Sequence, residues 1–320
     1  MAALNGALPS PASSGLLGIL VGARSRQAAH RALWGYLFIS PWLAGLTVFI
    51  AGPILASLYL SFTSYDILSA PKWLGLGNFQ RALFVDPLFW ASLGRSLYYA
   101  LGVVPLGLAG SLALAMLLNQ GLKGTNIFRT FFFLPHLTPA VALSIIWLWL
   151  LQPKLGPVNA GLSLIGLGGF PWFTDQLTAV PSFILVSLWT GIGGSAMLIF
   201  LAGLQGVPRE LEEAALVDGA GPWMKFRHVT LPIITPTIFF NLVLGIIGAL
   251  QVFTIAFVAT QGGPSYGSWF YNLHVYKQAF DYQRYGYGAA LAWIFLVLVL
   301  LITVANFALS RKWVFYRGAS

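Results

Sequence analysis

The chain has 320 residues, of which 58% are hydrophobic and only 8% are charged. Soluble domains carry about 25% charged residues, so this composition excludes an ordinary soluble protein and predicts an integral membrane protein. The absence of cysteine excludes disulfides, thiol catalysis and cysteine-ligated metal sites. The net charge of +9 is spread along the chain and does not form a long basic cluster, so we expect no nucleic-acid partner.

Residues 1–31 carry few signals of ordered structure. Proline and serine recur in the first half, and Arg24, Arg26 and Arg31 lie near the end. Residues 16–23 are apolar enough to resemble the core of a signal peptide, but the positive residues follow that core instead of preceding it. We therefore expect a flexible cytoplasmic tail over residues 1–31.

Six apolar runs follow, each at or beyond the ~20 residues that a helix needs to cross hydrocarbon. They contain no Asp, Glu, Lys or Arg, as expected, because a charge at the centre of a span costs at least about 2.5–3.5 kcal/mol. The runs cover residues 33–62, 96–118, 130–151, 179–204, 233–258 and 287–309. This pattern predicts an all-α, polytopic membrane protein with six transmembrane helices, whose transmembrane domain covers residues 32–312.

Another uncharged stretch, residues 155–174, is interrupted repeatedly by glycine and proline. It ends in Trp172 and Phe173, and aromatic residues of this kind are enriched at the level of the lipid headgroups. We expect an interfacial loop that contains short helical pieces. If the stretch were a span instead, the sidedness of everything after it would be reversed.

The distribution of positive charge tests this topology. With six spans and both termini in the cytoplasm, the inner side holds Arg24, Arg26, Arg31, Lys123, Arg129, Arg209, Lys225, Arg227, Arg311, Lys312 and Arg317. The outer side holds Lys72, Arg81, Arg95, Lys154, Lys277 and Arg284. The excess lies inside, as the positive-inside rule requires. We therefore predict cytoplasmic termini in the cell membrane, with a short C-terminal tail over residues 313–320.

The polar segment between the fourth and fifth runs differs from everything around it. It holds half of the acidic residues of the chain, namely Glu210, Glu212, Glu213 and Asp218. Pro208 suits a helix start, and acids in a first turn interact favourably with the helix dipole. Asp218-Gly219 predicts a turn with glycine at positive φ. A second short helix would begin at Pro222 and end at Leu231-Pro232. Two short helices joined at a bend are too short and too polar to cross a bilayer.

This segment resembles a known motif. Glu213-Ala214-Ala215, Asp218-Gly219-Ala220 and Leu231-Pro232 are similar to the cytoplasmic EAA loop of permease subunits in binding-protein-dependent ABC importers. Flanking motifs resemble the maltose-type sugar permease branch and extend the likeness over residues 33–311. They are Phe128-Arg129-Thr130, Phe133-Leu134-Pro135, Ala202-Gly203-Leu204-Gln205, Gln251-Val252-Phe253, Thr260-Gln261-Gly262-Gly263-Pro264, and Tyr276 with Ala279-Phe280. Glu212 departs from the pattern, because the family often has an aromatic residue there.

The resemblance implies the transmembrane domain of a type I ABC importer. Its partners would be a second, homologous permease, a dimer of ABC ATPase subunits and an extracytoplasmic solute-binding protein. The EAA-like residues would dock the ATPase, with Glu213 paired to a basic residue of that subunit and Gly219 providing the bend. The chain has no Gly-x4-Gly-Lys-Ser/Thr loop, so ATP and Mg²⁺ would be bound by the partner. We predict no catalytic residue, metal site or cofactor in this chain, and no enzyme activity.

Uncharged polar side chains inside the runs are candidates for a solute path. They are Asn241, Gln251 and Thr254 in the fifth run, and Ser187, Trp189, Thr190 and Ser195 in the fourth. The resemblance implies a sugar, an oligosaccharide or a related polyol as the solute, and Gln and Trp suit such a solute because sugars are bound by amide hydrogen bonds and aromatic stacking. Gln251 occupies the Gln-Val-Phe position of the resemblance. Alternatively, its amide bonds a neighbouring helix, since polar residues often join helices in membranes.

Other functions remain open from sequence. A glycerol-phosphate importer shares these motifs and would be favoured by a basic residue in the path, which the predicted spans lack. An ion-coupled secondary transporter or channel is a rival from another class, but such carriers usually need an intramembrane ionisable group. A membrane scaffold without a transported solute is a third reading.

Overall fold

The computed structural model describes residues 26–121 and 123–315. Most predicted tail residues, 1–25 and 316–320, lie outside that part, and so do Arg24 and Arg317 of the charge count. Regular structure in the described part is helical, apart from the antiparallel pair β1 (Thr63–Ser64) and β2 (Lys72–Trp73). The prediction of an all-α chain of membrane-length helices is confirmed.

The described chain divides into two compact units that meet between residues 59 and 60. The first unit holds most of the first predicted span. Its helix comprises α2 (Arg26–Gly45), the π-helical turn η1 (Leu46–Ala51) and α3 (Gly52–Ser61), and the stretch His30–Ser61 is long and apolar enough to cross a membrane. Helix α2 begins at Arg26, so the last residues of the predicted N-terminal tail are helical.

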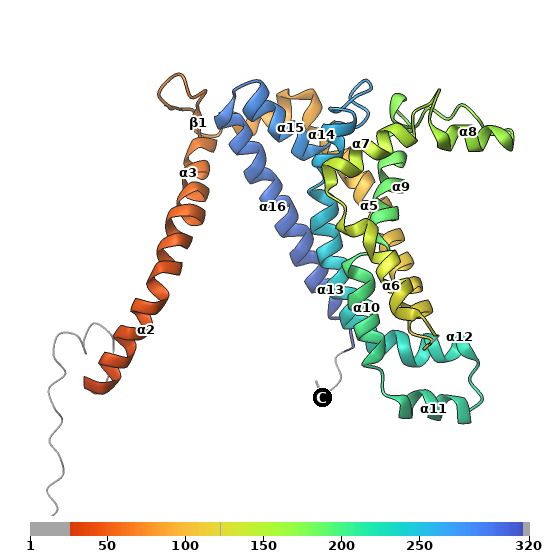
Figure 1. Cartoon of the computed structure of the whole chain (residues 1–320). Helices are drawn as coiled ribbons and strands as arrows, with labels where there is room; N and C mark the ends of the chain where they lie inside the picture. The colour runs from red at the N-terminus through yellow and green to blue at the C-terminus, as the bar shows by residue number, and fades with distance from the viewer. Residues whose placement is uncertain (1–25, 122, 316–320) are drawn as a thin grey trace, which may run out of the picture. The chain divides into compact units, whose positions relative to one another are not determined.

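The second unit contains three further stretches of membrane length. They are α5 (Pro87–Leu118), the stretch Pro222–Ala259 with α12 (Pro222–Lys225), η5 (Phe226–Thr230), α13 (Leu231–Leu250) and α14 (Thr254–Ala259), and α16 (Tyr285–Ser310). Shorter elements connect them: α4 (Gly77–Gln80), η2 (Arg81–Val85), α8 (Pro157–Leu164), η4 (Trp172–Thr174), α11 (Arg209–Val217), α15 (Tyr271–Tyr276) and η6 (Lys277–Asp281). Within this unit, Figure 1 shows α11 and α12 at one end and α8, α14 and α15 at the other.

Helix α5 is the centre of the second unit and packs against α9 (Ala179–Gly191), α10 (Ser195–Gln205) and α13. Glycines on α5 make this packing close. A Cβ at Gly102 would lie 2.5 Å from Ile184, and a Cβ at Gly110 would lie 2.7 Å from Ile192. Without a hydrophobic force between helices in lipid, such small residues stabilise association by letting backbones approach.

The third predicted span is a bent pair and not one continuous helix. Helix α6 (Thr125–Phe133), the 3-10 turn η3 (Leu134–Leu137) and α7 (Ala140–Leu150) change direction by 93°. Pro139 has no N–H to donate, and it forces the preceding Thr138 into an extended conformation with ψ 129°. The third span therefore bends sharply at Pro139 instead of continuing as one kinked helix.

The fourth predicted span is also broken, by 48° between α9 and α10. Gly193 and Gly194 lie in the break and are buried. A Cβ at Gly193 would collide with the backbone carbonyl of Phe132, and one at Gly194 would lie 2.7 Å from the ring of His136. The breaks of the two bent spans therefore meet, and only glycine allows that contact.

The stretch 155–174 contains the expected short helical pieces, α8 and η4. Asn159, which is 4% exposed, holds them together. Its amide donates to the carbonyls of Pro153 and Phe170 at 2.9 and 2.8 Å, and its oxygen accepts from Trp172 Nε1 at 2.7 Å. The interfacial position of this loop stays a prediction.

The contact between the two breaks generates a first prediction. Gly193→Ala should lower the free energy of unfolding by about 1–3 kcal/mol, because the added methyl group overpacks the site against the Phe132 carbonyl. Gly191→Ala is the matched control, since nothing lies within 4 Å of a Cβ at that position. The measurement is the melting temperature of each purified variant in detergent. Equal melting temperatures for the two variants would show that the breaks do not depend on each other.

Candidate functional site

The polar segment forms a helix and a closed turn, as predicted. Helix α11 follows Pro208, whose φ of −64° and ψ of 131° suit a helix start. At its other end, Gly219 has φ +78°. The N–H of Ala220 donates to the carbonyl of Ala215 at 2.9 Å, and the N–H of Gly219 donates to Leu216 at 3.0 Å. This pair of bonds is a Schellman motif, which requires a left-handed residue at the glycine position.

The second predicted helix does not end at Leu231-Pro232. Elements α12, η5 and α13 follow one another without a gap, so the helix that begins at Pro222 continues into the fifth span. The N–H of Leu231 donates to the carbonyl of Phe226, an i→i+5 bond of a π-helical turn. Such wider turns accommodate residues that disturb the regular ladder, as Pro232 does here. The predicted stop is therefore wrong, and the second short helix is an extension of the span.

An ion pair links the two arms of the loop. Glu212 Oε2 lies 3.6 Å from Lys225 Nζ, and both side chains are about one third exposed, at 35% and 29%. Pairs of this exposure contribute only about 0–1 kcal/mol. Glu212 is the residue that departs from the motif, and its partner explains what the carboxylate does in this chain. Glu213 and Ala214 are exposed, and Ala215 is partly exposed.

The loop also exposes large apolar side chains. They are Leu211 at 42%, Leu216 at 58%, Val217 at 88%, Trp223 at 70% and Met224 at 56% exposure. Large apolar side chains that gather on a polar, water-facing loop indicate a protein interaction site. The acids and these side chains together form the surface that we call the coupling surface.

A cavity of about 200 Å³ lies beside the break between α9 and α10, among α5, α9, α10 and α13. Its polar groups come from Ser111, Ser187, Ser195 and Asn241, and its remaining wall is apolar or glycine. Asn241 is 4% exposed, and its amide donates to the carbonyl of Thr237 at 3.2 Å. The Ser187 hydroxyl lies 2.7 Å from the hydroxyl of the buried Tyr99.

The structure brings together some of the predicted path residues and separates others. Gln251 is exposed and directly follows α13, away from the residues that line the cavity. Trp189 is 50% exposed and packs against Trp147 with ring centroids 5.3 Å apart. Thr190 donates its hydroxyl to carbonyls of its own helix. Sequence reasoning missed Ser111, although it is a polar residue inside the second run and the same rule would have selected it.

A charge lies on a membrane helix, contrary to expectation. Helix α5 begins at Pro87 and not at Ser96, so Arg95 falls within it. The Nη1 atom of Arg95 is buried and has no hydrogen-bond partner among the described residues. Arg95 as a whole is partly exposed, and an ionisable group on a spanning helix is costly and typically marks a functional position. The predicted absence of charge therefore holds for the apolar run but not for the helix.

Comparison with known proteins supplies an independent observation. Residues 106–314 match the family model described as binding-protein-dependent transport system inner membrane component. The chain is 43% identical over 299 residues to the probable ABC transporter permease protein YesP of Bacillus subtilis, covering 92% of this chain and 96% of that protein. It is 33% identical over 297 residues to the lactose transport system permease protein LacF of Rhizobium radiobacter, covering 91% and 98%.

Two further likenesses bear on function and fold. The chain is 33% identical over 287 residues to the sn-glycerol-3-phosphate transport system permease protein UgpA of Yersinia pestis, covering 88% of this chain and 95% of that protein. The fold is similar to a chain in the solved complex of a bacterial alginate ABC transporter with its alginate pentasaccharide-bound periplasmic protein. The TM-score is 0.79 with 23% identity, over 90% of this chain and 98% of that one.

The hydroxyl pair at the cavity gives a second prediction. Ser187→Ala leaves the Tyr99 hydroxyl, in a side chain that is 5% exposed, without its partner, and an unsatisfied buried donor costs about 1–3 kcal/mol. Tyr99→Phe removes that donor altogether and should cost less. Chemical denaturation of both variants in detergent micelles measures the difference. A larger loss for Tyr99→Phe than for Ser187→Ala would contradict the pairing.

Proposed function

The chain belongs to the family of binding-protein-dependent transport system inner membrane components, and on this basis we propose that it is the sugar-translocating permease subunit of an ABC importer. The observation that carries the proposal is the match over nearly the whole chain to permeases of this class, including one named for lactose transport. The membrane-length helices and the coupling surface fit that role. The chain is a multi-pass protein of the cell membrane.

Energy for transport comes from a separate ATPase in this proposal, because the chain has no phosphate-binding loop of its own. The coupling surface on α11 docks into that ATPase, and Glu213 and Leu216 are exposed for the contact. Since α12, η5 and α13 form one helix, a displacement of the docked loop is transmitted along it to Asn241. The loop and both termini lie in the cytoplasm, as the charge distribution favours.

The solute path includes the cavity beside the α9–α10 break. Ser187, Ser195 and Asn241 offer hydroxyl and amide groups of the kind that bind a hydroxyl-rich solute. Transporters commonly form their binding sites where spanning helices are broken, because unwound backbone is tolerated only where it lies against protein or lines a cavity. Asn241 therefore replaces Gln251 as the leading candidate for contact with the sugar.

The assembly requires a second permease, a dimer of ATPase subunits and an extracytoplasmic binding protein. In that assembly the binding protein delivers the solute to the outer face, and ATP is bound and hydrolysed only by the ATPase subunits. An ion-coupled carrier would need no such partners. Its uptake would survive loss of the ATPase and collapse with the ion gradient.

A specific observation favours a second candidate, an importer of phosphorylated or acidic solutes. Arg95 lies on a spanning helix with an unpartnered guanidinium nitrogen, and a guanidinium binds carboxylate or phosphate in a bidentate manner. One relative of 33% identity is named for sn-glycerol-3-phosphate transport. The uptake assay described below decides between the two candidates. Uptake of glycerol 3-phosphate and not of a neutral sugar would favour the second.

The turn of the coupling loop gives a third prediction. Gly219→Ala forces a Cβ onto a residue with φ +78°, which costs about 1–2 kcal/mol, and should reduce co-purification of the ATPase. Gly221→Ala is the matched control, because that residue has φ −69° and neither position has an atom within 4 Å of the added Cβ. The measurement is the ratio of ATPase to tagged permease after affinity purification. Equal ratios of ATPase to permease for both variants would show that docking does not depend on the turn at Gly219.

A fourth prediction concerns the cavity and tests the function directly. In cells that naturally carry this chain, its deletion should abolish uptake of radiolabelled lactose, maltose or another oligosaccharide from a panel that includes glycerol 3-phosphate. Asn241→Leu should lower that uptake at least tenfold at equal membrane abundance, because the buried amide is removed from the cavity. Gln251→Ala should change it less than twofold. Unchanged uptake of every solute after deletion would refute the proposed function.

A further inference from the structure

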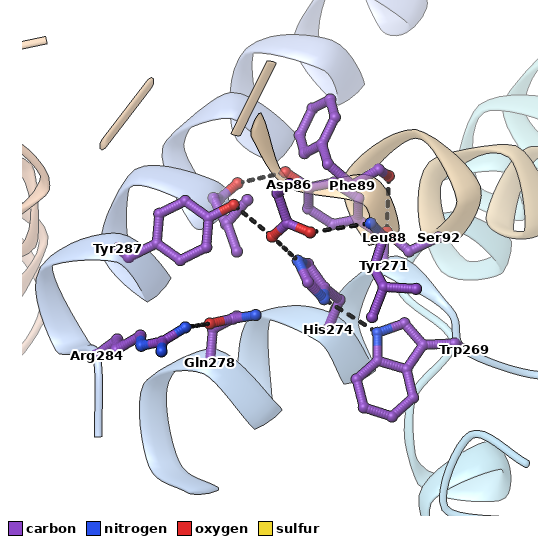
Figure 2. A network of polar contacts seen from close by, with 11 residues as sticks. Asp86, Leu88, Phe89, Ser92, Trp269, Tyr271, His274, Gln278, Arg284 and Tyr287 are labelled. Atoms are coloured by element: carbon purple, nitrogen blue, oxygen red, sulfur yellow. Dashed lines mark hydrogen bonds and ion pairs between the residues drawn. The ribbon is translucent and has the colours of Figure 1, made fainter. Parts of the chain in front are cut away.

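A buried polar cluster joins three elements far apart in the sequence (Figure 2). Asp86 caps the start of α5, where its Oδ1 accepts from the N–H of Leu88 at 2.9 Å. Its Oδ2 accepts from His274 of α15 at 3.0 Å and from the hydroxyl of Tyr287 of α16 at 2.6 Å. The side chains of His274 and Asp86 are 0% and 8% exposed. The proposed transport mechanism uses none of these groups.

The neighbours of His274 determine which of its nitrogens carries the proton. The indole Nε1–H of Trp269 lies 3.0 Å from His274 Nδ1. An indole nitrogen can only donate, so Nδ1 must accept and Nε2 must carry the hydrogen that is donated to Asp86. The hydrogen bonds therefore run in one direction: Trp269 donates to a neutral His274, and His274 donates to Asp86. Protonation of His274 would place a second N–H directly against that of Trp269.

The titration of both partners follows from this arrangement. Burial lowers the pKa of His274 below its ordinary 6.5 and outweighs the attraction of Asp86. Burial alone would raise the pKa of Asp86, but hydrogen bonds from Tyr287 and Leu88, together with His274, hold this pKa below its usual value. If the cluster opened, so that His274 and Asp86 were exposed to water, both side chains would bind protons with their ordinary pKa values. Acidification below about 6.5 therefore favours the opened state, first through His274 and then through Asp86.

Other charged and titratable groups face the cluster from the surrounding elements. The Arg81 guanidinium of η2 lies 4.7 Å from the ring centroid of Tyr287. Tyr271 of α15 donates its hydroxyl to the carbonyl of Leu291 at 2.8 Å. Arg284 donates to Gln278 at 3.4 Å and does not contact Asp86. Among these groups only His274 is an imidazole, the side chain whose charge ordinarily changes between pH 5 and 8.

The cluster holds a segment that connects two spans. Residues 260–284, which include α15 and η6, lead from α14, the last helix of the fifth span, to α16, and we call them the outer cap. Besides the bonds to Asp86, the N–H of Tyr271 donates to Ser96 Oγ on α5 at 2.9 Å. The cap, which follows α13 and α14 along the chain, therefore holds α15 and the start of α16 against the first part of α5. In the proposed function α13 is also the helix that transmits movement from the ATPase.

We propose that Asp86 is a positioning residue that holds the outer cap on α5 through neutral His274, and that acid on the outer side releases the cap and lowers solute uptake. The part concerning uptake rests on the proposed function, whereas the release of the cap does not. The chain lacks cysteine, so the release of the cap can be tested by site-directed labelling of the full-length protein without removing native thiols.

The first experiment measures the cap directly. Spin labels on cysteines introduced at Val85 and Tyr282, which are 72% and 52% exposed, report the distance between η2 and the cap in lipid nanodiscs. The labelled parent should give one narrow distance distribution at pH 7.5 and a broader one at pH 5.5. Asp86→Asn should be broad at both pH values, because an amide cannot accept from Leu88, His274 and Tyr287 in the same arrangement. Asp281→Asn, at an exposed acid on the cap that pairs with Lys277 within η6 and keeps an acceptor oxygen for it, should behave as the parent.

The sharpest variant is Trp269→Phe. It removes the N–H that opposes protonation of His274 Nδ1, so His274 can become charged while it still donates to Asp86. Burial still opposes a charged His274, so the distance distribution of this variant at pH 5.5 should be narrower than that of the parent, although broader than its own distribution at pH 7.5. A narrow distribution for Asp86→Asn at pH 7.5, or equal broadening of the parent and Trp269→Phe at pH 5.5, would overturn the proposal.

The second experiment links the cap to transport. Uptake of the solute identified in the cellular assay is measured with external pH 7.5 and 5.5 at constant internal pH. Acidification should lower the uptake of the unmodified chain at least fivefold, and it should lower the uptake of Trp269→Phe by a clearly smaller factor. Equal losses in both would refute the role in transport. If the unmodified chain shows no uptake at pH 7.5, the proposed function fails, and the spin-label distances still decide whether acid releases the cap.

Discussion

The arrangement of this protein depends on one constraint: in hydrocarbon, backbone polar groups must be satisfied by protein, because no water is available to them. A spanning helix can then break only where another segment covers the break. Here two broken spans cover each other, with Gly193 against the carbonyl of Phe132 and Gly194 against His136. Because the two glycines have no side chains, the break between α9 and α10 can pack directly against the end of α6 and η3.

Other features follow from that contact. The break between α9 and α10 places Ser195 beside Ser187 and Asn241, and this forms the polar part of the cavity. Helix α10 then leads directly into α11, while α12 leads back into α13. The loop between them is consequently attached to two of the four helices that border the cavity, α10 and α13. In the proposed importer, the same pair of helices contacts the solute and receives force from the ATPase.

Much of this fold could be predicted from sequence, and the failures have identifiable causes. Charge exclusion located the spans, and Gly219 revealed its turn because a left-handed residue there is required by local geometry. The helix end predicted at Pro232 was wrong because a π-helical turn accommodates this proline. Whether such a turn forms depends on the hydrogen bonding of the preceding residues. The grouping of Asn241 without Gln251, and the pairing of Asp86 with the distant His274, depend on how helices rotate and pack. Local patterns do not contain that information.

The unbroken helix from Pro222 to Leu250 has a geometric consequence. At 1.5 Å per residue it is about 43 Å long, so a tilt of about 5° around its inner end would shift its outer end by about 4 Å. A rigid rod of this length amplifies a small angular change without any hinge. In the proposed importer, a modest rearrangement at one membrane surface would therefore move the other end of this helix by a distance comparable to the width of a sugar ring.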